Sequence, residues 1–240
     1  MTCIICAKGA DGDVIIADKL VTDDEVATLQ SKIHILWDKV VVAGAGTTLL
    51  QQKLSEGLQK SKMPDTTDPS QAVETVEDVM RSIYDRYSPR LGRYYDLEAI
   101  VMGLEGFGKG DPYARLVHAD GTAEWIEDHK SIGHGSPYAL PLMTLFYDRM
   151  LTAQELAVLG FFVIANIIMS RLDQTVGTDT LGPDMVILKT DGTPEFLNPQ
   201  ASDFSTAMNS LKGLRYRFKL VKSIWNAVPQ AYENLPKEMF

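Results

Sequence analysis

The first 44 residues are dense in β-strand signals, and this restricts the fold of the whole chain. Two short apolar runs, residues 3–8 and 14–18, flank a segment with two glycines and two aspartates, a pattern typical of a β-hairpin. Segment 32–44 contains two further apolar runs that turn near residues 37–39. Four strands in succession at the start of the chain predict a sheet, with Thr2 opening its first strand.

Helices and further strands follow in separate groups. Apolar residues recur at three- and four-residue steps over 47–59 and 71–87, where we expect Thr47 to cap the first helix and Pro89 to end the second. Segment 19–30 is polar and is interpreted as a strand end and a loop. The remaining predicted elements are a strand at 97–104, a hairpin of 114–118 and 122–126, helices at 136–150 and 152–172, and a strand at 185–188.

This segregated order predicts an α+β fold rather than alternating βαβ units. Two antiparallel sheets would pack face to face with a helix pair outside each, which makes a four-layer α/β/β/α sandwich. We expect residues 1–200 to form this domain. Residues 201–240 are expected to be a C-terminal helical extension, whose apolar residues over 204–224 would pack on the same domain or on a neighbouring subunit.

Composition disfavours several classes of partner. The formal net charge is −9 and the isoelectric point is near 4.9, whereas binding to nucleic acid or an anionic membrane requires clustered lysine and arginine. A membrane span needs about 18 apolar residues, and the longest candidate, 156–169, is interrupted by Gly160 and Asn166. The start of the sequence lacks the basic region of a secretory signal. We therefore expect a cytoplasmic protein with neither nucleic acid nor membrane as a partner.

Cys3 and Cys6 form a C-x-x-C pattern that also occurs in metal and redox sites. Residues three apart on a strand point to opposite faces, so the two thiols are not expected to meet. None of the four histidines stands beside another at ligand spacing. The interpretation is two small core residues and no metal site.

Thr2 is the candidate nucleophile. Once Met1 is removed, it carries a hydroxyl and a free α-amine on the same residue. The unperturbed pKa of an α-amine is about 7.7–8.0, so the amine can accept the hydroxyl proton directly or through water. The alternative is that a threonine at position 2 only favours removal of Met1.

Six fragments in order give the chain a resemblance to a known family. They are IIADKLVT, SKIHIL, VVVAGAG, GHGSPYA, SRLDQTVG and PDMVIL. Together with Thr2 they resemble the proteasome β-subunit and its bacterial relatives, within the N-terminal nucleophile hydrolases. The resemblance extends from Thr2 to about Asp191 and implies the same four-layer sandwich. It also implies cleavage of peptide or amide bonds through an acyl-enzyme on Thr2, without a cofactor or metal, in a ring-like homo-oligomer.

The resemblance implies roles for three more residues. In the family, the lysine that matches Lys32 lies beside the terminal hydroxyl, and the aspartate that matches Asp18 pairs with it. An ammonium there lowers the pKa of the hydroxyl and disfavours protonation of the amine. By the same resemblance, the Gly44 N–H matches the oxyanion-hole donor. The alternatives are a solvent-facing lysine and a nucleotide loop, but Leu49 replaces the third glycine of G-x-G-x-x-G.

The sequence departs from the family pattern at two polar positions. His134 stands where a serine usually contacts the terminal amine, and Val176 stands where a second serine is usual, whereas Asp173 is kept. His134 would either substitute as a hydrogen-bond partner or proton carrier, or the site is degraded. The positions that line the specificity pocket of the family are matched by Thr22, Ala27 and Ala45.

Three functions follow from this pattern. The first is a threonine-type peptidase that acts on peptides or proteins. The second, from another class, is a structural or binding homologue that kept the sandwich and lost the chemistry. The third uses the same acyl-enzyme in a peptide ligase or an amidohydrolase.

Overall fold

A computed structural model describes residues 2–23, 26–62, 69–105, 110–179, 181–190 and 192–198. The predicted extension at 201–240 and its apolar helix lie outside the described residues. Among the described helices, none combines the length and apolarity of a membrane span.

The first sheet is built around the N-terminal hairpin. Its strands run in the order β10-β1-β2-β11-β12, and each neighbouring pair is antiparallel. The predicted hairpin is confirmed, with Ile4 opposite Ala17 and Lys8 opposite Asp13. The strand bounds are β1 (Ile4–Lys8), β2 (Gly12–Ala17), β10 (His129–Ile132), β11 (Asp184–Lys189) and β12 (Glu195–Phe196). Thr2 therefore precedes β1 by two residues rather than opening it.

The second sheet has the order β5-β6-β7-β8-β9 and is also antiparallel. Its central strands are almost wholly buried, because the sheet is covered on both faces. The strand bounds are β5 (Ile33–Leu36), β6 (Val40–Gly46), β7 (Leu97–Leu104), β8 (Pro112–Val117) and β9 (Ala123–Trp125). The predicted strand at 97–104 is thus confirmed with its bounds.

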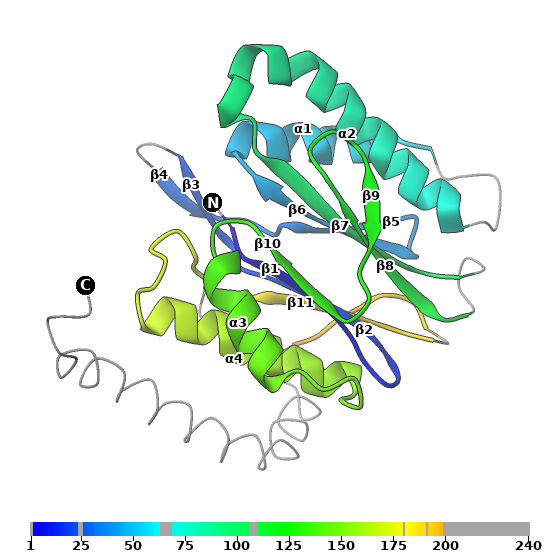
Figure 1. Cartoon of the computed structure of the whole chain (residues 1–240), viewed down its shortest axis with the longest axis vertical. Coiled ribbons are helices and arrows are strands. Elements are labelled where there is room, and N and C mark those ends of the chain that lie inside the picture. The colour runs from blue at the N-terminus through cyan, green and yellow to red at the C-terminus, as the bar shows by residue number, and fades with distance from the viewer. Residues whose placement is uncertain are drawn as a thin grey trace, which may run out of the picture.

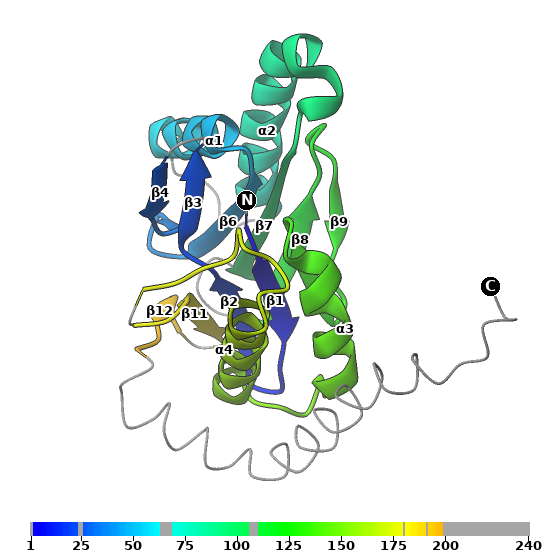
Figure 2. The same ribbon diagram turned by 90° about the vertical axis from the view of Figure 1, so that its left-hand side faces the viewer.

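Two helix pairs cover the outer faces of the sheets (Figures 1 and 2). Helices α1 (Thr48–Lys60) and α2 (Pro69–Leu91) pack on the second sheet, α1 through Leu50, Leu54 and Leu58 and α2 through Val76 and Met80. Helices α3 (Ser136–Phe146) and α4 (Ala153–Met169) pack on the first sheet. The capping box of Thr152 and Glu155 is present at the start of α4. The structure confirms the four-layer α+β sandwich.

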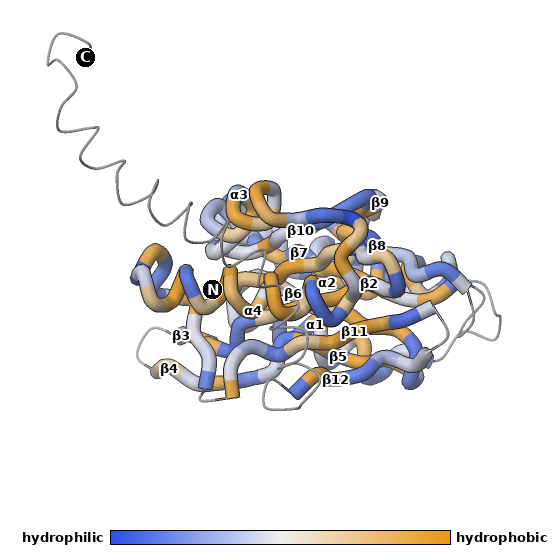
Figure 3. The backbone as a smooth tube through the Cα atoms, turned by 90° about the horizontal axis from the view of Figure 1, so that it is seen from below, coloured by the Kyte–Doolittle hydropathy of each residue, from blue (hydrophilic) through white to orange (hydrophobic). Residues whose placement is uncertain are grey.

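Strand alternation decides which layer each side chain joins. Ile4, Cys6 and Ile15 lie in the core between the two sheets, whereas Cys3 and Ile5 face α3 and α4. Figure 3 shows this interior as predominantly hydrophobic segments of the strands and of α4. The two cysteines are buried, unbonded and on opposite faces of the sheet, as the spacing predicts.

The structure corrects three local predictions. Segment 19–30 forms a separate two-stranded ribbon, β3 (Leu20–Asp23) and β4 (Val26–Leu29), where a loop was predicted. Pro89 lies inside the last turns of α2 rather than after its end. Pro89 lacks the N–H for one helical hydrogen bond and crowds the carbonyl four residues earlier, but the helix ends only two residues later, so few further bonds are affected. Strands β10 and β12 were not predicted, because both are short and only partly apolar.

The β5–β6 turn allows a direct test of backbone strain. Trp37 and Asp38 both have positive φ, 53° and 59°, and the Lys39 N–H donates to Leu36 O at 3.0 Å. This is the two-residue hairpin geometry that favours glycine at its second position. Asp38 is exposed. Asp38→Gly is therefore expected to raise the free energy of unfolding by about 0.5–1 kcal/mol in urea titrations, and Asp38→Val to lower it.

Candidate active site

Thr2 lies two residues before β1, and β1 contacts β6 of the other sheet (Figure 2). Thr2 is buried, with 1% of its surface exposed to solvent. The Thr2 carbonyl accepts a hydrogen bond from the Gly135 N–H at 3.0 Å. At Gly133, φ is +84° and an added Cβ would lie 2.4 Å from Thr2 O. The 133–135 turn therefore packs closely against the Thr2 backbone, and this close contact leaves no room for a side chain at position 133.

Asp18 joins three segments of chain around Thr2. It follows β2 and is fully buried. Its Oδ1 accepts from the Cys3 N–H at 2.8 Å, and its Oδ2 accepts from the N–H groups of Leu20 and Gly177, both at 3.2 Å. One carboxylate thus fixes the residue after Thr2, the start of β3 and the loop that follows α4.

Lys32 completes the buried cluster. Its Nζ lies 2.7 Å from Asp18 Oδ1 and donates to Leu20 O at 2.7 Å. The side chains of this ion pair are 1% and 0% exposed. The backbone of Lys32 is also held, because Lys32 O accepts from the Gly44 N–H at 3.3 Å. Lys32 and Asp18 are therefore brought together beside the Thr2–Cys3 peptide, as the resemblance implies.

Burial sets the direction of the pKa shifts in this cluster. It lowers the pKa of Lys32 because the ammonium loses hydration, while the contact with Asp18 acts in the opposite direction. Burial likewise raises the pKa of Asp18 against the effects of Lys32 and the backbone donors. Burial also raises the pKa of the Cys3 thiol to about 12, with the Asp18 charge acting in the same direction. Cys3 is therefore a neutral thiol beside the site.

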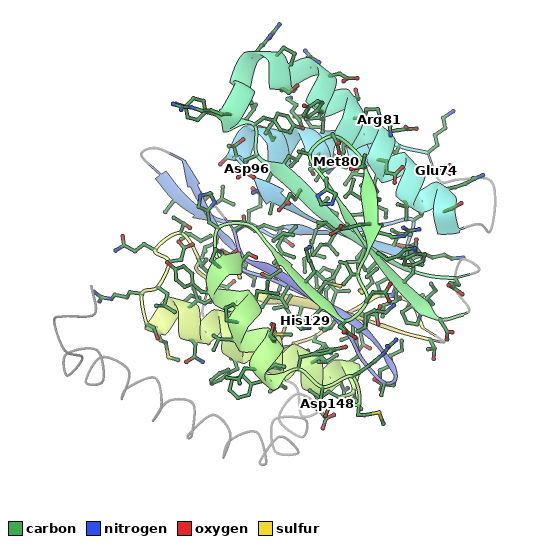
Figure 4. All side chains as sticks on the ribbon, in the orientation of Figure 1. Glu74, Met80, Arg81, Asp96, His129 and Asp148 are labelled. Carbon is green, nitrogen blue, oxygen red and sulfur yellow. The ribbon has the colours of Figure 1, made fainter. Side chains whose placement is uncertain are left out.

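A side chain that the sequence analysis did not identify, Gln51, links the Thr2 hydroxyl to the end of β6. Gln51, on α1, donates from Nε2 to Thr2 Oγ at 3.2 Å and to Gly46 O at 2.7 Å. At Gly46, φ is +155° and an added Cβ would lie 2.2 Å from Asp96 O. Asp96, labelled in Figure 4, directly precedes β7. Gly46 is therefore the point where only glycine lets β6 turn into α1.

The expected oxyanion donor, the Gly44 N–H, has a hydrogen-bond acceptor in this structure. It donates to Lys32 O at 3.3 Å, directly before the start of β5. Backbone N–H groups two residues apart in a strand point to the same side. The Gly46 N–H therefore points to the same side of β6 as the Gly44 N–H. At Gly46, however, β6 has extended past the start of β5 at Ile33, so no residue of β5 lies opposite.

In the described part of the chain, neither His134 nor Asp173 has a side-chain hydrogen bond to the Thr2 hydroxyl. His134 is exposed, and its side chain makes no hydrogen bond to Thr2 within the described part of the chain. Asp173 Oδ1 accepts from the backbone N–H and the hydroxyl of Thr175, so it organises its own loop. Val176 is buried in the core shared with Cys3. At the position where the family usually has a second serine, this chain therefore has an apolar side chain packed in the core.

The predicted pocket residues are divided between two elements. Thr22 pairs with Ala27 across the β3–β4 ribbon, and Ala27 is exposed. Ala45 is buried in the core between the sheets and pairs with Glu98 of β7. In the described segments, no group of three or more histidine, cysteine or acidic side chains is arranged to hold a metal ion.

The layering and the position of Thr2 define a proteasome-like fold of the N-terminal nucleophile type. The family model described as "Proteasome subunit" matches residues 1–175. The chain therefore belongs to the proteasome subunit family. A comparison with curated protein sequences gave no match.

Solved structures of similar fold include Anbu, the ancestral beta-subunit, from three bacteria. The Yersinia bercovieri protein has a TM-score of 0.69 at 14% identity, with 98% of each chain covered. A Gly-1 mutant of Anbu from Hyphomicrobium sp. strain MC1 has a TM-score of 0.66 at 16% identity, with 99% of each chain covered. The helical assembly of the Anbu complex from Pseudomonas aeruginosa has a TM-score of 0.68 at 16% identity, covering 98% of this chain and 97% of that one.

Proposed function

We propose that this chain is an N-terminal threonine hydrolase that cleaves peptide or amide bonds through an acyl-enzyme on Thr2 after Met1 is removed. The observation that carries the proposal is the buried Lys32–Asp18 ion pair, hydrogen-bonded to the Cys3 N–H directly after the nucleophile. The membership of the proteasome subunit family supports the same reaction class.

The buried ion pair favours a functional role over a purely structural one, because a buried pair contributes little to the stability of a fold. Removing two charges from water costs several kcal/mol per ion, and well-packed apolar residues often replace such a pair at no loss of stability. Here the pair lies next to the peptide group that joins the proposed nucleophile to Cys3. Lys32 would lower the pKa of the Thr2 hydroxyl, and Asp18 would hold the Lys32 side chain in position.

The proposed reaction uses groups of this chain alone. Thr2 Oγ attacks the carbonyl carbon while its proton passes to the α-amine, directly or through water. The C–N bond of the substrate breaks, the leaving amine takes that proton, and an ester to Oγ remains. Water then attacks the ester, the C–Oγ bond breaks, and Oγ regains a proton as the carboxylic acid is released. An amine in place of water would give ligation.

The oxyanion donor in this proposal is the Gly46 N–H rather than the Gly44 N–H. The first reason is that the Gly44 N–H already donates to Lys32 O. The second is that Gly46 is linked to the Thr2 hydroxyl through Gln51. A backbone donor of this kind is typically worth about 3–4 kcal/mol of the barrier.

The proposal includes self-association. A solved structure of similar fold is titled the helical assembly of the Anbu complex, so we infer a homo-oligomer for this chain also. Its substrates would be peptides or proteins that reach Thr2 within that assembly.

A non-catalytic subunit is the second candidate function. Two observations favour it: Val176 is apolar and buried where a serine is usual, and His134 is exposed. Such a chain would keep the sandwich for assembly. Retention of Met1 on the native protein would block the α-amine and favour this function.

The test is labelling with a peptide epoxyketone, which forms its ring only with a free hydroxyl and α-amine on one residue. Intact mass first establishes the fraction of protein without Met1. We expect a stable adduct on Thr2 that disappears in Thr2→Ala and Lys32→Ala, and persists in Lys53→Ala. Lys53 is a suitable control because it forms a partly exposed surface pair with Glu56. No adduct on protein without Met1 would contradict the proposal.

A further inference from the structure

The Gln51 side chain contacts the Thr2 hydroxyl directly, with Nε2 donating to Thr2 Oγ at 3.2 Å. It is half-buried on the first turn of α1, and its amide bridges Thr2 Oγ and Gly46 O. Its neighbour Gln52 is exposed. Two adjacent glutamines on one helix thus occupy different environments, and one of them contacts the nucleophile.

The bridge determines how the amide is oriented. Gly46 O can only accept a hydrogen bond, so the group that faces it must be the NH₂ of Gln51 rather than its oxygen. The NH₂ carries two hydrogens, one for Gly46 O and one for Thr2 Oγ. Oγ therefore receives a donor on one lone pair, and its own proton is left free for a base.

We propose that Gln51 is a further catalytic residue of the Thr2 site, which holds the nucleophilic oxygen in one rotamer and stabilises it as negative charge develops. This inference rests on the proposed function. Lys32 would act through charge, whereas Gln51 acts through a directed contact with the reacting atom. The second half of the bridge ties that contact to Gly46, so the nucleophile and the end of β6 keep a constant separation.

The same donor serves both halves of the reaction. During acylation, it favours Oγ as its proton leaves for the α-amine. During deacylation, water adds to the ester carbon and the C–Oγ bond breaks, so Oγ again gains negative charge before it takes a proton. A hydrogen bond to a charged oxygen is stronger than one between neutral groups, so the contribution of the Gln51 amide grows as Oγ gains negative charge. Its loss should therefore slow both steps.

The test compares Gln51→Met and Gln51→Glu with the matched controls Gln52→Met and Gln52→Glu. Gln51→Met keeps the length of the side chain without a donor, and the epoxyketone labelling rate should fall about tenfold. Gln51→Glu places a negative charge beside the hydroxyl of the residue that carries the α-amine, which should raise the pKa of that amine and move the pH–rate profile to higher pH. The Gln52 variants should match wild type in both measurements.

An NMR measurement separates this inference from the proposed function. The Thr2 methyl group is labelled with ¹³C, and its shift and χ1 couplings are followed against pH. In Gln51→Glu, the Thr2 signal should titrate with the introduced carboxyl, and in Gln51→Met the single rotamer should be lost. If wild type fails to label but these changes occur, the proposed function fails and the Gln51 contact stands. An unchanged Thr2 signal in both Gln51 variants overturns the inference, whatever the labelling rate.

Discussion

Lys32→Met is expected to lower the free energy of unfolding by about 3–5 kcal/mol, because it leaves Asp18 as a buried charge without its counter-ion. The Asp18 side chain is 0% exposed, so water cannot replace the lost ammonium. The three backbone donors that remain on Asp18 hold its position but carry no full charge. Urea unfolding at neutral pH measures the loss.

Two lysines with less buried partners provide a graded control. Lys19 is 14% exposed and pairs with Asp179 and Asp184, so Lys19→Met should cost about 1 kcal/mol. Lys53 forms a pair that is about one-third exposed, so Lys53→Met should cost less than about 0.5 kcal/mol. Adding Asp18→Asn to Lys32→Met should recover part of the stability, since no charge then stays buried. Equal losses for Lys32→Met and Lys53→Met would contradict this account.

Asp13→Asn is expected to stabilise the protein at pH 8 and to leave its stability almost unchanged at pH 4. Asp13 is 2% exposed at the end of the first hairpin, and its Oδ2 has no hydrogen-bond partner among the described residues. The hairpin end is covered by the loop after α3, where the Tyr147 hydroxyl donates to Lys8 O at 2.8 Å. Figure 4 shows Asp148 of this loop near the hairpin. Burial raises the pKa of Asp13 to about 7, against the charges of Lys8 and Arg149.

The sign of the pH dependence follows from this shift. The unfolded Asp13 has a pKa of about 3.9, so between that pH and about 7 the unfolded state releases a proton that the folded state still holds. The folded state loses stability over that window by up to about 4 kcal/mol, and the loss is constant above it. Asp13→Asn removes this dependence, which thermal unfolding at pH 4, 6 and 8 would reveal. Asp85→Asn, on an exposed position of α2, is the control. A parallel pH dependence in Asp13→Asn and wild type would contradict the prediction.

The sequence is sufficient for the layers because the signals for them are local. Alternation in β1 and β2 separates Cys3 from Cys6 and shows that both faces of the hairpin are apolar. The capping box at Thr152 depends on residues three apart and is observed as predicted. The β3–β4 ribbon has no such signal. Its two apolar runs are only two or three residues long and are separated by acidic residues in the sequence, and their pairing depends on how segment 19–30 leaves the sheet.

The site divides in the same way. Thr2, Asp18 and Lys32 are identifiable from the order of fragments along the chain, since each stands at a strand end. Gln51 is one of two adjacent glutamines in a polar helix segment, and no pattern distinguishes it from Gln52. The tertiary structure distinguishes them: the turn from β6 into α1 at Gly46 orients α1 so that Gln51 points toward Thr2.

The sequence alone therefore determined the sandwich, the nucleophile candidate and the ion pair behind it. Only the tertiary structure decided which glycine of β6 has its N–H engaged, because that depends on where β5 begins relative to β6. It also decided that Val176 joins the core and His134 faces solvent. Hydrogen-bond partners and burial are set by residues distant in the chain, and a one-dimensional pattern does not contain those distances.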